Sequence, residues 1–316
     1  MMPLEFYWGH FLRTQVTTVD GFLWMVESAF PSFMLSVLMV FLVLEPLEFL
    51  RPWRKAQKKI RPQLWIDVFY TLFNTQFMWV LFGTVILSTW ILVSHHALQH
   101  FFGVRPQDLL VIELDKVPMW ARFVAMYLFT DLVEYLGHWA SHRVTFLWHF
   151  HRVHHSSKEL DIWNANRFHC VEFLWGGYVG YFTMALIGFP AEEVVAVAFL
   201  LAVTNVYSHA NVNIPLGPLK YIFNNPQLHI WHHAASVDPR RNVNYGSSLA
   251  VWDYLLGTAY RPEGRPTPEL GYHGDEDFPS GLWAQFLDPF VAIGRDIRGW
   301  SPRRKASPPA PPNAIT

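Results

Sequence analysis

Histidine is the residue type whose number and spacing in this sequence predict chemistry. The chain has 16 histidines, and 11 of them fall between residues 138 and 233. Eight belong to three short clusters: His138-x-x-x-His142, His151-x-x-His154-His155 and His229-x-x-His232-His233. Positions i, i+3 and i+4 of a helix lie on one face, so each cluster can present two or three imidazoles towards a common point. This spacing is typical of metal ligands.

The number of clustered histidines predicts more than one metal ion. Neutral imidazole is a ligand for iron, copper, nickel and zinc, and eight imidazoles exceed what one four- or six-coordinate ion can bind. His209, between the second and third clusters, raises the set to nine. The alternative for one His-x-x-His pair is a polar helix end, but chance is a poor explanation for two His-x-x-His-His clusters. The single cysteine, Cys170, permits neither an internal disulfide nor a thiolate cluster. We therefore expect two ions held by nitrogen and oxygen ligands.

The composition indicates a membrane protein with a substantial polar part. Hydrophobic residues make up 52% of the 316-residue chain and charged residues only 16%, where about a quarter is typical. Aromatic residues reach 17%, an excess typical of membrane-interface belts. The mean hydropathy of +0.15 is low for a chain made only of spanning helices. The net charge of −1 argues against a nucleic-acid-binding protein, which would carry a clear basic excess.

Apolar stretches in the first half of the chain predict spanning helices. Residues 30–50 predict one, and the basic, acid-free stretch 51–61 after it predicts a cytoplasmic loop by the positive-inside rule. Such a loop could dock an acidic partner, but it more often only sets the topology. Residues 64–93 predict a second, tilted span. Pro118 opens a third over residues 118–138, which returns to the cytoplasmic side.

A helical hairpin is predicted after the second histidine cluster. The apolar stretches 171–187 and 191–207 are separated by Gly188-Phe189-Pro190, and glycine and proline commonly end one helix and begin the next. Counted from the basic loop, the predicted spans place all three clusters and His209 on one face of the membrane. Groups that are distant in the sequence can therefore meet in space.

Three carboxylates lie where they could orient a histidine ligand. Asp131 and Glu134 are seven and four residues before the first cluster, on the same helical face of an apolar segment. Acids inside a membrane are usually functional, so we expect them to orient an imidazole through its other nitrogen or to line the pocket. The alternative is a helix-end carboxylate paired with Arg143 or Arg152. Asp253 could orient a ligand in the same way or cap a local turn.

The order of these residues resembles one known family. The three clusters, with a lone His209 in Ser-His-Ala-Asn-Val before the last, are followed by Asn244-Tyr-Gly246 and by Trp252-Asp-Tyr-Leu-Leu-Gly257-Thr258. Over roughly residues 120–260, this arrangement resembles the fatty acid hydroxylase/sterol desaturase superfamily of integral-membrane di-iron enzymes. The repeated cluster order is the specific part of the resemblance, and the two later segments support it.

The resemblance implies a di-iron centre with two ions, dioxygen as co-substrate and a lipid substrate that enters from the membrane. His169 lies in a stretch that looks like the family's His-Pro-x-Glu element, with Cys170 where proline is usual, so we expect it beside the ligands or in the pocket. His149 falls outside the i, i+3, i+4 pattern, and whether it touches metal stays open. Carried over position by position, the expected ligands are His138, His142, His151, His154, His155, His209, His229, His232 and His233.

The predicted function is hydroxylation or desaturation of a C–H bond in a sterol, fatty acyl or related lipid, with O2 and external electrons. The sequence has no Gly-x-Gly-x-x-Gly motif and no cysteine set for an iron–sulfur cluster, so we expect a separate electron donor of the ferredoxin, cytochrome b5 or reductase type. The alternative is a membrane zinc-dependent hydrolase that uses the same histidines, although His-Glu-x-x-His is absent.

The predicted fold class is all-α, a polytopic membrane helical bundle with a cytoplasmic helical cap that carries the histidine-rich di-metal site. We expect N-terminal membrane helices in residues 1–117, the di-iron catalytic domain with the hairpin in 118–265, and a C-terminal extension in 266–316, disordered from about 301. The N-terminus lacks the pattern of a removable signal peptide. The expected location is multi-pass in a bacterial inner membrane, rather than the endoplasmic reticulum, with the active site on the cytoplasmic side.

Overall fold

The fold is taken from a computed structural model of the chain. The residues that it describes are 30–78, 87–104, 114–176, 178–187, 189, 191–235, 243–262 and 267–299. The expectations for the extreme N-terminus and for the tail from residue 301 lie outside these residues.

Helices are the ordered elements of the described residues, and no β-sheet forms among them, so the all-α class is confirmed there. Two isolated β-bridges pair Phe223 with Leu249 and Ala234 with Leu270. The α-helices are α2 (Phe30–Leu50), α3 (Leu64–Leu72), α4 (Leu87–Phe102), α5 (Met119–Arg143), α6 (Thr145–His155), α7 (Tyr178–Leu186), α8 (Ala191–His209), α9 (Pro226–His232), α10 (Val251–Leu256) and α11 (Leu282–Ile297). The short 3-10 and π-helical turns are η2 (Phe73–Met78), η5 (Leu114–Lys116), η6 (Cys170–Leu174), η7 (Gly217–Tyr221) and η8 (Asp275–Asp277).

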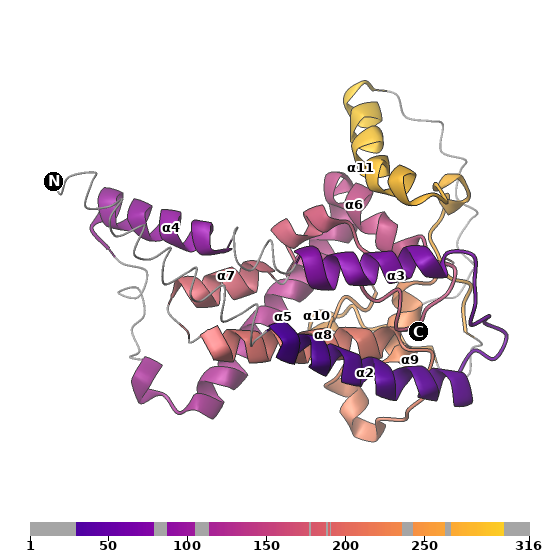
Figure 1. The fold of residues 1–316 in the computed structure, drawn as a ribbon, viewed down its shortest axis with the longest axis horizontal. Helices are drawn as coiled ribbons and strands as arrows, with labels where there is room; N and C mark the ends of the chain where they lie inside the picture. Colours follow the sequence, from indigo (N-terminus) through magenta and orange to yellow (C-terminus); the bar gives the residue numbers. More distant parts are fainter. Residues whose placement is uncertain are drawn as a thin grey trace.

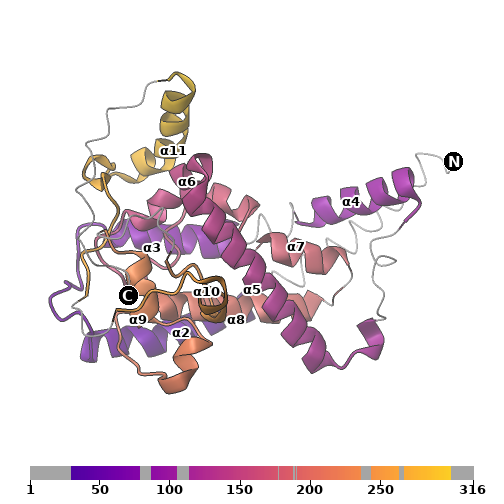
Figure 2. The ribbon, with the colours of Figure 1, turned by 180° about the vertical axis from the view of Figure 1, so that it is seen from behind.

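Helix α5 is the central element of the molecule. It starts directly after Pro118, as expected, because proline is favoured at the start of a helix. Its 25 residues cross the molecule diagonally and end beside α6, which views from front and back both show (Figures 1 and 2). α5 packs against α6, α7 and α8. Met126 of α5 is buried against Met184 of α7 and Val197 of α8, so the predicted hairpin lies on the helix that carries the first histidine cluster.

The predicted hairpin is present, but its first arm is not one helix. Residues 170–174 form the 3-10 turn η6, and α7 begins only at Tyr178, so the expectation of a continuous helix over 171–187 is wrong. The side chain of His169 accepts the N–H of Val171 at 3.2 Å, and Glu172 accepts the N–H of His169 at 3.1 Å. These two reciprocal hydrogen bonds form a capping box, which starts the η6 turn at His169. The second arm, α8, forms as expected after residue 190.

The expected membrane topology is not confirmed by the helices. α2 forms over the residues expected for the first span, and the expected span 64–93 contains α3, η2 and the beginning of α4. Among the described residues, no helix is at once long and apolar enough to cross a membrane. The spanning assignments stay predictions.

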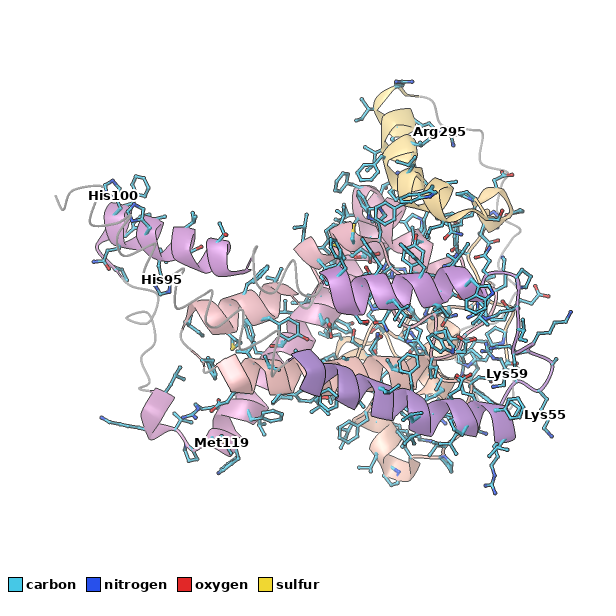
Figure 3. All side chains as sticks on the ribbon, viewed as in Figure 1. Lys55, Lys59, His95, His100, Met119 and Arg295 are labelled. Carbon is cyan, nitrogen blue, oxygen red and sulfur yellow. The ribbon has the colours of Figure 1, made fainter. Side chains whose placement is uncertain are left out.

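The basic stretch 51–61 is divided between internal and outward-facing residues. Lys55 and Lys59 extend from the body of the molecule, at the opposite end from His95 and His100 on α4 (Figure 3). Arg61 is instead buried, with an exposed fraction of 3%, and forms ion pairs with Asp67 and Asp161. Part of this predicted loop is therefore a component of the core and not a free basic surface.

Candidate metal centre

Four helices direct their C-terminal ends towards one region of the molecule. α5 carries a cluster histidine in its last turn, α6 carries two, α8 ends at His209 and α9 carries two more. The C-terminal end of a helix bears a partial negative charge, which favours a cation. The arrangement of these helices therefore suits bound metal ions before any side chain is considered.

The structure brings all nine predicted ligands together, in two separate groups. Within each group, one ligand atom per residue lies within 4.8 Å of every other. The first group, called here the five-histidine group, contains His138, His142, His151, His155 and His232. The second, the four-histidine group, contains His154, His209, His229 and His233.

The two groups are neighbours. His155 of the five-histidine group stacks on His233 of the four-histidine group, with ring centroids 4.5 Å apart. His154 and His155, adjacent in the sequence, belong to different groups and have ring centroids 5.5 Å apart. Two ions in these positions would therefore lie side by side.

Each three-histidine cluster is divided between the groups: two of its imidazoles share one group, within the expected two or three, and the third belongs to the other group. His151 and His155 share the five-histidine group, whereas His154 belongs to the other. In the last cluster His229 and His233 share the four-histidine group, and His232 crosses over. At about 100° per residue, positions i and i+4 are about 40° apart and positions i+3 and i+4 about 100° apart. An i, i+4 pair can therefore share an ion, while the i+3 residue faces the other.

The nitrogen atoms of the four-histidine group converge as ligands of one ion would. Nε2 of His209 lies 3.2 Å from Nε2 of His154 and 3.1 Å from Nε2 of His229, which lies 3.0 Å from Nε2 of His233. Two nitrogens that bind one ion at about 2.1 Å and at right angles are about 3.0 Å apart. The distances between these imidazoles therefore fit a shared cation.

In the five-histidine group, buried nitrogens lack hydrogen-bond partners. Nε2 of His138, His151, His155 and His232 is buried and accepts no hydrogen bond from the protein. A buried polar atom without a partner is costly and requires an explanation, such as an ion. The donor set is nitrogen only, which suits iron, copper, nickel or zinc. The residues present therefore fit two nitrogen-ligated metal ions.

The opposite ring nitrogen of five ligands is fixed by an oxygen atom. Because each of these acceptors is an oxygen, the Nδ1 atom carries the hydrogen and Nε2 keeps its lone pair for a metal. In four of these ligands Nδ1–H donates to a backbone oxygen: His138 to Tyr245 (2.8 Å), His154 to Arg167 (3.2 Å), His209 to Asn205 (2.8 Å) and His232 to Val243 (3.0 Å). In the fifth, His151, Nδ1–H donates to Oε2 of Glu172 (2.7 Å).

Burial lowers the pKa of several of the clustered histidines, which keeps their imidazoles neutral. It lowers the pKa of His232 to about 3 and that of His209 to about 4. Burial, together with the surrounding imidazoles, also holds the pKa of His155 and His233 well below 6.5. Since a metal binds the neutral ring, the site is ready for metal at pH 7 without losing protons.

His149 and His169 lie outside both groups. Nε2 of His149 is 2.7 Å from Oδ2 of Asp296 on α11, which places it against the C-terminal extension. His169 uses Nδ1 to cap η6 and donates through Nε2 to the backbone oxygen of Phe286 at 3.0 Å. His169 is thus connected to the ligands through the turn that carries Glu172, whose carboxylate contacts His151.

The predicted carboxylates act through backbone segments and the cavity. Asp131 accepts hydrogen bonds from the N–H groups of Ser248 (3.0 Å) and Leu249 (3.2 Å) and from the indole of Trp252 (2.8 Å), so it holds α10 against α5 (Figure 2). Arg152 pairs with Asp288 instead of Asp131. Glu134 lines a cavity and is hydrogen-bonded to Ser247.

Asp253 caps the loop that follows the third cluster. It accepts the N–H of Tyr245 at 2.7 Å and that of Gly246 at 2.8 Å. A Cβ at Gly246 would collide with the backbone oxygen of Leu249 and the carboxylate of Asp253, which explains glycine there. The cap fixes Tyr245, whose carbonyl holds His138, so Asp253 orients this ligand at one remove. Asp253 therefore caps a local turn by direct hydrogen bonds, and it affects the ligand only through Tyr245.

Glu172 contacts a predicted ligand, and the sequence analysis assigned it no role of its own. Its carboxylate accepts the backbone N–H of His169 at the start of η6 and also the Nδ1–H of His151. The available signal was the His169-x-x-Glu172 spacing of a capping box next to a histidine cluster. Arg167 was also missed, and no local pattern marks it.

A cavity of about 210 Å³ reaches both histidine groups. Residues from both groups line it, including His138, His151 and His209. Away from the histidines its walls are mainly apolar and come from α2, α8 and η6, for example Val40, Leu201 and Phe173. Polar groups such as Glu134 and Asn205 lie in the same wall. An apolar slot with a few polar groups is typical of a site for an apolar ligand.

The fold and site define a helical protein built around two neighbouring groups of mostly buried histidines. Residues 123–258 match the fatty acid hydroxylase family. Ornithine lipid hydroxylase OlsE of Rhizobium tropici is 34% identical over 60% of this chain and 56% of its own length. Alkylglycerol monooxygenase of Caenorhabditis elegans is 25% identical over 60% of this chain and 38% of its own length. The Delta(7)-sterol 5(6)-desaturase of Gibberella zeae is 26% identical over 56% of this chain and 47% of its own length. No solved structure matches the chain.

The match of residues 123–258 to this family, together with relatives named as a lipid hydroxylase and a sterol desaturase, confirms the resemblance in the order of the histidines. All nine histidines of the two groups lie within the matched residues 123–258. The chain spans about half the length of these curated relatives, or less.

Proposed function

We propose that this protein is a membrane-bound oxygenase that hydroxylates or desaturates a C–H bond of a lipid, with two iron ions and O2. The observation that carries the proposal is the division of nine imidazoles, eight of them from buried residues, into two neighbouring groups beside an apolar cavity. The names of the relatives support it, because each describes a hydroxylase, monooxygenase or desaturase of a lipid.

The five-histidine group would hold one iron and the four-histidine group the other. When bound, the two irons supply the activation of O2 that an unreactive C–H bond requires, with electrons from a separate donor protein of the ferredoxin, cytochrome b5 or reductase type. The chain fixes the ligands by holding each Nδ1–H on an oxygen. This second contact commonly sets both the orientation and the basicity of a metal-binding histidine.

The cavity would position the lipid. Its apolar wall, with Leu201 and Phe173, suits a hydrocarbon segment, and the five- and four-histidine groups at its other side face the C–H bond to be cleaved. An apolar chain in the cavity would displace water, which protects a reactive centre from side reactions. Which C–H bond lies nearest the histidines would decide whether an alcohol or an alkene forms.

A lipid substrate also predicts where in the cell the protein lies. A lipid that enters from a bilayer requires a protein in contact with that bilayer, and the composition of the chain favours a multi-pass arrangement with the histidines on the cytoplasmic side. Because one relative is a bacterial ornithine lipid hydroxylase, we favour a bacterial inner membrane.

The first test is the metal content of the detergent-purified full chain, measured beside a His232→Ala/His233→Ala double variant. These two adjacent histidines belong to different groups, so one short change removes a ligand from each. The exposed His273→Ala variant is the matched control. We expect about two irons per chain in the protein and the control, and a loss in the double variant.

Lipid extracts of cells that express the protein then test the reaction. We expect a lipid heavier by one oxygen or lighter by two hydrogens, absent with the double variant. Zinc that remains after anaerobic iron reconstitution, or no metal at all, would overturn the proposal in favour of a hydrolase or a structural site.

A further inference from the structure

Arg167 is a fully buried cation next to the four-histidine group. It lies in the segment between α6 and η6, and its exposed fraction is 0%. It is the largest of the fully buried side chains among the described residues. A buried charge of this kind is costly unless it is paired and hydrogen-bonded, so its contacts indicate what it is for.

Arg167 holds the end of α6 from two sides. Its backbone oxygen accepts Nδ1–H of His154 at 3.2 Å. Its guanidinium donates through Nε to the backbone oxygen of Val153 at 3.2 Å and through Nη2 to Oγ of Ser156 at 3.0 Å. These contacts lie directly before and just after His154. The same residue therefore fixes both the ring of this ligand and the last turn of the helix that carries it.

Asp67 compensates the charge of Arg167. Arg167 Nη1 donates to Asp67 Oδ1 at 2.6 Å, and both side chains have an exposed fraction of 0%. Asp67 also accepts from Arg61, which binds both oxygens of Asp161 at 2.8 and 3.0 Å. Two arginines and two aspartates thus form a neutral buried network. Gln63 (2.6 Å) and Gln285 (3.2 Å) accept further hydrogen bonds from Arg167 Nη2.

Several members of the network lie outside the residues that match the family. Arg61, Gln63 and Asp67 precede residue 123, and Gln285 follows residue 258. Only Asp161 and Arg167 belong to the matched region. The support of one histidine ligand therefore depends on segments from before and after the region that supplies all nine ligands.

We propose that Arg167, held in place by Asp67, is a positioning residue that orients His154 and is required for metal binding by the four-histidine group. The proposal rests on the proposed function, because it presupposes that this group binds a metal ion. The proposal gives the segment 61–67 a role in the site, because this segment holds the side chain that orients a ligand of one of the two ions. Three ligands of the five-histidine group, His151, His138 and His232, have supports of their own in Glu172, Tyr245 and Val243.

Anaerobic titration of the detergent-purified full chain with ferrous iron tests the proposal. The variants are Arg167→Gln, Arg167→Lys and Asp67→Asn. The matched control is Arg122→Gln, because Arg122 forms a part-buried bidentate pair with Glu193 at the other end of α5. We expect two ions in the wild type and the control. In the three variants we expect one ion bound as in the wild type and the second weakened roughly 10- to 100-fold, the usual effect of losing a contact behind a ligand.

Double variants show which group is affected. In a His142→Ala background, where the five-histidine group has lost a ligand, Arg167→Gln should also weaken the remaining tight site. In a His209→Ala background it should change little, because the four-histidine group is already disrupted. The helical content and thermal midpoint of each variant are measured alongside. Arg167→Lys, which keeps the charge opposite Asp67, and Asp67→Asn keep the test valid if Arg167→Gln does not fold.

Each outcome bears on one of the two proposals. A wild-type chain that binds fewer than two ions overturns the proposed function before the variants matter. Two ions bound with unchanged affinity in folded Arg167 and Asp67 variants overturn the positioning role. Equal weakening of both ions, or the same loss in Arg122→Gln, overturns it as well, because the network would then act only on global stability.

Discussion

Glu172 accepts the Nδ1–H of His151 at 2.7 Å with one carboxylate oxygen and the backbone N–H of His169 at 3.1 Å with the other. One side chain thus joins the turn that breaks the predicted hairpin to a ligand of the five-histidine group. The turn and the site have the same physical cause: the cap that starts η6 also holds an imidazole.

Replacing Glu172 with Gln should weaken the five-histidine group. Glutamine has one oxygen and one amide nitrogen, so it can accept from only one of the two N–H groups. We expect roughly 10- to 100-fold weaker binding of one ferrous ion, with the other unchanged, measured by competition with a chelator. The exposed Glu276→Gln is the control. Unchanged affinity for both ions would contradict this role for Glu172.

Two histidines of α6 should differ in their effect on metal content: His155, an expected ligand, and His149, whose contact with metal the sequence left open. His155→Ala removes a ligand from the five-histidine group and should lower the iron content towards one ion per chain. His149 is on the same helix but contacts Asp296, so His149→Ala should keep both ions. Elemental analysis of the two purified variants decides the matter. Loss of iron in His149→Ala would show that this residue supports the site.

A larger side chain in the apolar wall should block the lipid without affecting the metals. Ala202 lines the cavity of about 210 Å³, seven residues before His209 on α8, and phenylalanine at this position would fill much of the cavity. We expect Ala202→Phe to lower the yield of modified lipid more than tenfold while the iron content stays at the wild-type value. The exposed Leu255→Phe is the control. Wild-type product yield from Ala202→Phe would place the substrate elsewhere.

The metal-free protein should lose stability as the pH falls below about 6.5. Burial lowers the pKa of His209 to about 4 in the folded chain, against about 6.5 when unfolded. Between these values the unfolded chain binds more protons, so the free energy of unfolding decreases as the pH falls from 6.5 to 4. His209 alone contributes about 3 kcal/mol over this window.

Thermal unfolding of the chelator-treated protein at pH 8, 6.5 and 5 measures this effect. The midpoint should fall between pH 6.5 and 5 and change little above 6.5. Bound iron competes with protons for the imidazoles and should reduce the fall. The exposed His273→Ala control should behave as the wild type. A midpoint that is the same at pH 5 and 8 without metal would show that the histidines are not buried as neutral rings.

The sequence alone identified the nine histidines that meet, the start of α5 after Pro118 and the break between α7 and α8. These features depend on local physics. Proline fixes the start of a helix, and the spacing of three and four residues brings side chains to neighbouring positions on one surface. The family could also be inferred, because its specific signal is an order of residues along the chain.

Only the tertiary structure decided how the histidines divide into groups of five and four. Helical periodicity predicts that His151 and His155 can share an ion, but their partners His138 and His232 come from other helices. The placement of those helices depends on packing and on buried contacts between distant segments, such as Asp67 with Arg167 and Asp131 with Ser248. Such contacts carry no signal in the local sequence, because a buried ion pair has no fixed spacing along the chain.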